Sequence, residues 1–181
     1  LRLLAHAVTS TKDCVTIADL QDNLIFMNEA FCKVYGYSQE EIVGKKVSVL
    51  RAASVTPEEG EQIFRETLAG SWYGEVMNRR KDGSEFPIEL WTSIVRDELG
   101  EPIATVGVCR DITERRRTQE ALLASEVKFR TLFENVQEGV YQSSPDGKLI
   151  TVNPAFVQMF GYDSAEEMLG LDVGRDLYIN P

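Results

Sequence analysis

The sequence predicts an α+β fold in which a five-stranded antiparallel sheet has its helices on one face. Three observations lead to this prediction. Two short β-rich segments come early and three longer ones come late, with short helical patterns between the two groups. Tight turns join the three late segments, so neighbouring strands there must be antiparallel. The apolar share of 43% is enough to build the core of such a domain.

The start of the chain combines one helical pattern with a strand pair. Apolar residues at helical spacing predict a short amphipathic helix over residues 3–8. The β-rich residues 14–18 and 24–27 predict two strands. The polar residues 19–23 between them predict the turn of a hairpin.

Two capping patterns predict short helices after this hairpin. Asn28 has a side chain that can cap a helix N-terminus, and Gly36 ends the helical pattern that follows it. Ser38 and Glu41 have the spacing of a capping box, in which each side chain bonds the backbone amide of the other residue. Gly44 is expected to end this second helix after one or two turns.

A longer helix is predicted from Thr56 to Gly70. Pro57 stands at the first helical position, and acidic residues follow it at the positive end of the helix dipole. The residues expected on its buried side are Ile63, Phe64, Thr67 and Leu68.

The late strands are predicted from alternation and turn chemistry. Strands are predicted at residues 72–79, 85–95 and 103–110, and within the second of them successive residues alternate between the two faces of a sheet. An Asp-Gly turn at residues 81–84 joins the first two of these strands, and residues 97–102 form the second turn.

Residues 114–130 predict a continuous connector helix, because they contain neither Gly nor Pro and are rich in helix formers. Apolar residues recur there at the three-four spacing of a weak coiled coil. A dimeric coiled coil is favoured over a helix lying on its own domain, because so polar a helix gains little from packing. The residues expected at the dimer seam are Leu122, Phe129 and Phe133.

The chain also contains an internal repeat. Residues 28–37 recur as residues 153–162 with the same residue types around the helix start and the following glycine. An in-register match at one period indicates two copies of one folding unit. We therefore expect a complete module over residues 1–113, the connector, and the front half of a second module over residues 125–181.

The second copy contains the first two strands of the unit but not the three late ones. Such a half sheet would expose an edge and much of its core face. We expect it to be covered by a second subunit, by exchange of segments, or to belong to a longer modular protein.

Composition narrows the possible partners. The net charge of −10 argues against binding to nucleic acid and to anionic membrane surfaces. The apolar runs are too short to span a bilayer. The three cysteines, Cys14, Cys32 and Cys109, lack metal or CxxC spacing and are expected to be small core fillers in a reducing, cytoplasmic compartment.

Taken together, these motifs resemble tandem PAS domains with PAC motifs, which are sensory modules of bacterial signalling proteins such as histidine kinases and diguanylate cyclases. Residues 28–44 resemble the front half of the family pattern. Residues 72–75, 78–83 and 107–115 resemble the back half. The resemblance implies a PAS-like sheet and says little about the ligand, because one scaffold serves many sensors.

The resemblance implies a non-catalytic sensory, regulatory and dimerisation module. A signal from the pocket or from a partner would pass through Asp111, Ile112 and Thr113 to the connector and a downstream output domain of the same chain. The side chains of Asp111 and Thr113 can cap the connector helix and also bond back to the sheet or to the first helix. The alternative is a constitutive protein-interaction scaffold without a ligand.

An enzymatic role is not expected for this segment. The single histidine, His6, stands at the N-terminal edge, so a Ser-His-Asp set cannot be assembled. The sequence also lacks a Gly-rich phosphate loop, an HExxH motif and metal-spaced clusters. The parent protein is expected to be a histidine kinase or a cyclic-di-nucleotide enzyme.

The resemblance also sets demands for a cofactor. A haem-binding relative needs an axial ligand, commonly a His on the long helix, and residues 57–69 have none. A relative that bonds flavin covalently needs a Cys within residues 44–50, which also have none. Haem and covalent flavin are therefore not expected.

Non-covalent FAD for redox sensing remains an alternative, because Trp72, Gly74 and residues 78–82 match that type. Against it, residues 48–57 lack the usual Ser/Asn-Gly pair. We favour an apolar pocket that is empty, holds a small molecule, or is packed as core. The candidate pocket residues are Ile17, Met27, Phe31, Tyr35, Leu50, Phe64, Trp72, Met77 and Asn78.

Overall fold

The computed structural model describes residues 11–177 of the 181-residue chain. The chain divides into two compact units, Leu1–Arg117 and Thr118–Pro181. The helix predicted over residues 3–8, together with His6, lies outside the described residues. None of the described helices combines the length and the apolar character that crossing a bilayer requires.

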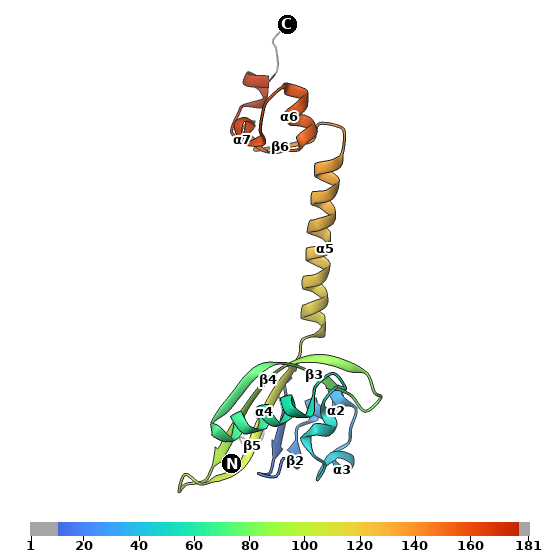
Figure 1. Cartoon of the computed structure of the whole chain (residues 1–181), viewed down its shortest axis with the longest axis vertical. Coiled ribbons are helices and arrows are strands. Elements are labelled where there is room, and N and C mark those ends of the chain that lie inside the picture. The colour runs from blue at the N-terminus through green and yellow to red at the C-terminus, as the bar shows by residue number, and fades with distance from the viewer. Residues whose placement is uncertain (1–10, 178–181) are drawn as a thin grey trace. The chain divides into compact units, whose positions relative to one another are not determined.

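The first unit contains the predicted five-stranded sheet (Figure 1). All neighbouring strands are antiparallel and lie in the order β2-β1-β5-β4-β3. The early hairpin thus joins the late three-stranded segment through β1 and β5, which are far apart in sequence. The strands are β1 (Cys14–Ala18), β2 (Leu24–Met27), β3 (Ser71–Arg79), β4 (Glu85–Arg96) and β5 (Pro102–Asp111).

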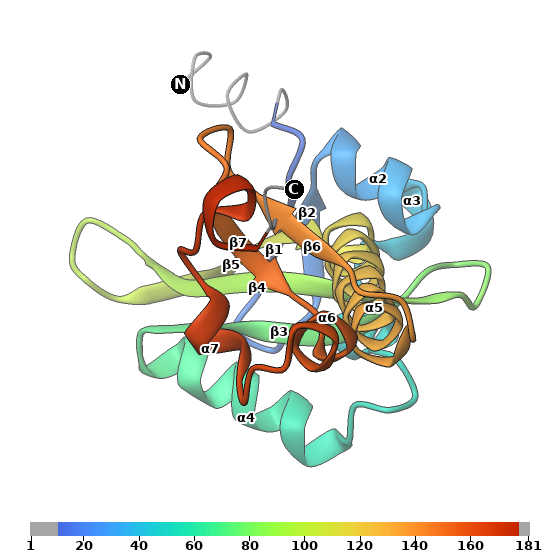
Figure 2. The ribbon, with the colours of Figure 1, turned by 90° about the horizontal axis from the view of Figure 1, so that it is seen from above.

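Four helical segments separate β2 from β3. Both predicted capping boxes form, at Ser38 with Glu41 and at Thr56 with Glu59. One of the four, the 3₁₀ helix η1 (Val47–Leu50), was not predicted from the sequence, because four residues are too few to show a helical period. In Figure 2, α4 runs beside β3, whereas α2 packs against β1 and α3 against β2. The segments are α2 (Glu29–Tyr35), α3 (Gln39–Ile42), η1 (Val47–Leu50) and α4 (Pro57–Ala69).

Asn28 joins the first hairpin to α2 from a fully buried position. Its Oδ1 accepts hydrogen bonds from the amides of Val15 and Phe31, both at 3.0 Å. Its Nδ2 donates to the carbonyl of Asp13 at 2.9 Å. One side chain therefore caps the helix and also holds the backbone next to β1.

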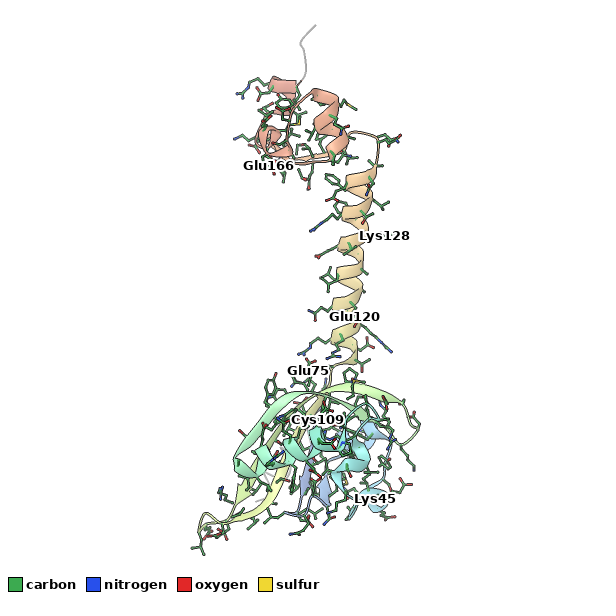
Figure 3. All side chains as sticks on the ribbon, in the orientation of Figure 1. Lys45, Glu75, Cys109, Glu120, Lys128 and Glu166 are labelled. Atoms are coloured by element: carbon green, nitrogen blue, oxygen red, sulfur yellow. The ribbon has the colours of Figure 1, made fainter. Side chains whose placement is uncertain are left out.

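The helix α5 (Thr113–Asn135) is longer than the predicted connector of residues 114–130. The helical pattern continues because no Gly or Pro occurs within its bounds. None of its residues is buried, and its side chains project on all sides, as Figure 3 shows for Glu120 and Lys128.

The second unit repeats the start of the first. Asn153 accepts from the amides of Val140 and Phe156, both at 2.9 Å, and donates to the carbonyl of Glu138. These contacts match those of Asn28 one repeat earlier. Its elements are β6 (Tyr141–Ser143), β7 (Leu149–Val152), α6 (Pro154–Phe160), α7 (Ala165–Met168) and a final π-helical turn η2 (Val173–Leu177).

The second unit has a small core and an incomplete sheet. Its two strands pair only with each other among the described residues. Ile150 and Met159 are more than half exposed, as expected for the front half of a module. The buried cluster consists of Leu149, Val152, Phe156, Val157 and Met168.

The two asparagines provide a matched test. Asn28→Ala leaves two buried amides without their acceptor, so we expect the first unit to lose about 2–4 kcal/mol of its unfolding free energy. Both tryptophans of the chain, Trp72 and Trp91, lie in the first unit. Urea unfolding followed by Trp fluorescence should therefore show a lower midpoint for Asn28→Ala and an unchanged midpoint for Asn153→Ala. Equal shifts in both variants would contradict this assignment.

Candidate functional site

The first unit contains a partly open cavity of about 550 Å³. Its walls come from the inner side of the sheet, from α2, from η1 with the segment after it, and from α4. The helices and the sheet thus meet around a space large enough for a small ligand.

Five of the nine candidate pocket residues line this cavity. They come from four separate elements, which the fold brings around one space. These residues are Phe31, Tyr35, Leu50, Phe64 and Asn78.

The other four candidates lie elsewhere. Ile17 stands between two cavity-lining residues of β1, so strand alternation turns it to the opposite face. Met27 is fully buried in the core cluster. Trp72 and Met77 line a second, smaller cavity of about 360 Å³. The Trp72 ring lies so close to Gly74 that a Cβ there would come within 2.7 Å of it.

A chain of polar side chains crosses the wall of the large cavity. Arg51 Nη1 donates to Asn78 Oδ1 at 3.2 Å, and Asn78 Nδ2 donates to the Tyr35 hydroxyl at 2.6 Å. That hydroxyl lies 3.4 Å from Cys109 Sγ. Burial raises the pKa of Tyr35, so this residue is a neutral phenol that links α2 to the sheet.

Arg51 and Asp22 are two charged lining residues that the sequence did not single out. Burial lowers the pKa of Arg51, and burial also raises the pKa of Asp22 to about 6 against the attraction of Arg51 and Lys46. Both stand in irregular segments, where no periodicity marks a buried position. An Arg directly after an apolar pair, in Val49-Leu50-Arg51, was the only available signal.

A second arrangement of polar groups lies where β5 becomes α5. Arg80 donates from Nη2 to Asp111 Oδ2 at 2.7 Å and from Nε to the carbonyl of Val34 at 3.0 Å. Its guanidinium carbon stands 3.7 Å from the ring centroid of Phe86. One side chain thus connects the end of α2, a core aromatic ring and the start of the connector.

The three predicted joint residues have different roles. Asp111 Oδ1 accepts from the amide of Thr113 at 2.9 Å, as expected for a cap, and its other oxygen bonds Arg80. Ile112 is buried and its amide donates to the carbonyl of Pro87. The Thr113 hydroxyl, in contrast, is buried without a hydrogen-bond partner in the described part of the chain, so it does not share the expected capping role.

The first turns of α5 are also fastened to the outer side of the sheet. Arg115 pairs with Glu75 at 2.9 Å and with Glu89 at 3.4 Å, and Arg116 also pairs with Glu75. The Tyr73 hydroxyl donates to Glu89 at 3.0 Å. Figure 3 shows Glu75 next to the start of the helix.

The three predicted seam residues lie along α5. Leu122 and Phe129 are each more than half exposed, and Phe133 is partly exposed. The rings of Phe129 and Phe133 stack with centroids 5.8 Å apart. These side chains form an apolar stripe along α5, which also exposes Leu123, Val127 and Leu132.

Among the described residues, no group of three or more His, Cys, Asp or Glu side chains is arranged so that it could hold a metal ion. All three cysteines are free, and Cys14 and Cys109 are buried. The cavity lining combines apolar walls and neutral polar groups with the charged residues Asp22, Arg51, Glu61 and Arg79, an arrangement that suits a small ligand.

Both units match a known family. Residues 12–114 match a family described as "PAS domain", and residues 127–180 match a second family of the same description. The front-half motif lies within the first match, and so do the back-half motifs except for residue 115.

Three curated relatives are similar to most of this chain. The nitrogen fixation regulatory protein of Klebsiella oxytoca is 24% identical over 157 residues, which cover 86% of this chain and 32% of that protein. The blue-light-activated histidine kinase 1 of Erythrobacter litoralis (strain HTCC2594) is 30% identical over 140 residues, which cover 72% of this chain and 39% of that protein. The oxygen sensor protein DosP of Escherichia coli (strain K12) is 24% identical over 156 residues, which cover 80% of this chain and 18% of that protein. The chain thus spans well under half of each relative's length.

Solved structures show the same fold. The PAS domain of a protein from Colwellia psychrerythraea is similar with a TM-score of 0.56 and 30% identity, covering 62% of this chain and 97% of that one. An RNA-binding light-oxygen-voltage receptor is similar with a TM-score of 0.59 and 32% identity, covering 68% of this chain and 37% of that one.

The raised pKa of Asp22 predicts a pH-dependent difference in stability. The folded state holds the Asp22 proton more tightly than the unfolded chain does. The protonated Asp22 therefore contributes to the unfolding free energy fully below the unfolded pKa of about 4. This contribution is lost as the pH rises through about 6, the pKa of Asp22 in the folded state. Asp22→Asn removes the charge and suits the left-handed backbone at φ +64°.

We expect the Asp22→Asn variant to be more stable than the unmodified chain at about pH 8 and equal to it at about pH 4. Urea midpoints from Trp fluorescence at both pH values give the comparison. A stability difference that stays constant between the two pH values would contradict the expectation.

Proposed function

Because the chain belongs to the PAS domain family, we propose that it is a non-catalytic sensory and regulatory module of a bacterial signal-transduction protein. Its tandem PAS domains are of the kind found in bacterial signalling proteins, including a histidine kinase. In this proposal the state of the cavity in the first unit sets the position of α5, and α5 acts on an output domain further along the parent protein.

The observation that carries the proposal is the position of Arg80. It bonds the carbonyl of Val34, which directly precedes the cavity residue Tyr35, and it also bonds Asp111 at the start of the connector. Both bonds use the same guanidinium, whose plane is rigid. A shift at the end of α2 therefore changes the geometry that Arg80 offers to Asp111.

The transmitting step needs two alternative arrangements, because packed cores do not deform continuously. The ion pair of Arg80 with Asp111 supplies one such contact, since it is either made or broken. The buried Ile112 keeps the backbone of the joint attached to β4 in both arrangements. The exposed ion pairs of Arg115 and Arg116 can exchange with water at small cost.

We further propose that two copies associate through α5. Its apolar stripe is exposed, and a helix with this composition gains stability mainly from a partner of the same kind. A homodimer would let a change in one cavity alter the register or rotation of both connector helices.

Two rival functions remain to be separated. A constitutive interaction scaffold would have the same fold but no link between the cavity and α5. A redox sensor that binds FAD is supported by the cavity and by Asn78 on its wall, and the purified protein would then absorb blue light. A colourless preparation would reject the FAD-binding function and leave the proposed one in place.

Coupling between the cavity and the connector is tested by combining two substitutions. Tyr35→Phe removes the hydroxyl that bonds Asn78, and we expect it to change hydrogen exchange of the amides of residues 113–117. In the Asp111→Asn background, which lacks the ion pair with Arg80, this change should disappear. Mass spectrometry of exchanged peptides gives the measurement.

Glu120→Gln serves as the matched background, because it also removes one carboxylate near the start of α5 but lies away from the joint. There the effect of Tyr35→Phe should be retained. The same effect in both backgrounds would refute transmission through Asp111, and no effect in the unmodified chain would favour the scaffold.

Self-association through α5 is tested at its apolar stripe. Phe129→Ser removes a large exposed ring, so we expect the dissociation constant of the dimer to rise about tenfold or more. Lys128→Ser, next to it on the same helix, should have little effect. Sedimentation velocity over a range of concentrations measures both, and equal behaviour of the two variants would contradict association along this stripe.

A further inference from the structure

The wall of the large cavity contains a cation that the described fold does not neutralise. The hydrogen bond of the Arg51 side chain goes to Asn78, which is neutral. A guanidinium has five N–H donors, and the described residues provide no ion pair for this one. Burial lowers the pKa of Arg51, which records the cost of removing this charge from water. Arg51 is half-buried, and charges withdrawn from water in proteins are normally paired.

No ion pair joins Arg51 to a described carboxylate, although Asp22 and Glu61 line the same cavity. Residues 1–10 and 178–181, which the structure does not describe, contain no Asp or Glu. Asp22 acts on Arg51 through space without forming an ion pair with it, and burial raises the pKa of Asp22 to about 6. The counter-ion of Arg51 is therefore expected to be a ligand.

The remaining walls of the cavity indicate what kind of anion could bind there. Apolar side chains cover most of the wall, among them Phe31, Leu50, Ile63, Phe64 and Leu90. The volume of about 550 Å³ lies in the range of pockets that enclose small organic molecules. A ligand that fills it needs an apolar body and one anionic end.

We propose that the first unit binds a small organic carboxylate, whose carboxylate group pairs with Arg51 and whose apolar body lies against Phe31, Leu50 and Phe64. A guanidinium and a carboxylate match as a planar, two-bond pair. A phosphate monoester fits less well, because its second charge would remain unpaired beside Asp22. The inference rests on the proposed function, since it names the ligand class of the cavity which that function uses.

Phenylacetate and its uncharged isostere phenylacetamide are suitable probes. Titration calorimetry on the full chain should show phenylacetate binding about tenfold or more tightly than phenylacetamide, because only the carboxylate pairs with Arg51. Arg51→Gln should abolish this preference, whereas Arg51→Lys should retain part of it. Arg65→Gln, on the exposed side of α4, should leave it intact.

Asp22→Asn gives a test with the opposite sign. It removes a negative charge from the cavity wall, so phenylacetate should bind more tightly while phenylacetamide binding stays constant. Trp fluorescence checks that each variant is folded. Should Arg51→Gln fail to fold, Arg51→Lys and Asp22→Asn decide the outcome. Equal binding of the two probes, no binding of either, or a preference that survives Arg51→Gln would overturn the proposal.

The ligand class and the sensory function fail separately. Binding of phenylacetate through Arg51 with unchanged hydrogen exchange at residues 113–117 would keep the ligand class and reject the transmission. Coupling of Tyr35→Phe to those amides without any preference for the carboxylate would keep the transmission and reject the ligand class.

Discussion

The attachment of the C-terminal end of α2 to the end of β3 is the contact on which the first unit depends. Asn78 donates to the Tyr35 hydroxyl, the amide of Lys81 donates to the carbonyl of Tyr35, and Arg80 donates to the carbonyl of Val34. Since α2 is only seven residues long, it has little stability of its own. These three bonds hold its C-terminal end, as Asn28 holds its start, and thereby position one wall of the cavity.

The sequence predicts those parts of the fold that depend on local chemistry. Asn28 and the capping box of Ser38 with Glu41 mark helix starts because their partners lie three residues away. Contacts between residues that are far apart in the chain are harder to predict from the sequence. Arg79 and Arg80 look alike in the sequence, yet only tertiary contacts bring Arg80 to Asp111.

The residues that line the cavity were also only partly predictable from the sequence. Phe31 and Tyr35 belong to a helix whose apolar side is readable, and both line the cavity. Ile17 is apolar and central in its strand, but the period of two turns it away from the cavity, and only the strand register decides which face is inner. Arg51 was not assigned because its one sequence signal, a position directly after an apolar pair, does not show that the cation lines a cavity.

The two proposed sites are neighbours in the sequence: Asn78 lines the cavity, and Arg80 bonds Asp111 at the start of the connector. A carboxylate at Arg51 would compete with Asn78 for the same guanidinium, and Asn78 is also the donor to Tyr35. Loss of the Arg51 contact frees the Asn78 carboxamide to turn, which alters the hydrogen bond that holds α2. Arg80 follows two residues later and senses the same helix end through Val34. In this proposal, binding of one anion at Arg51 changes the contacts of Asn78 and then of Arg80. The effect arrives at Asp111 without a large movement of the core.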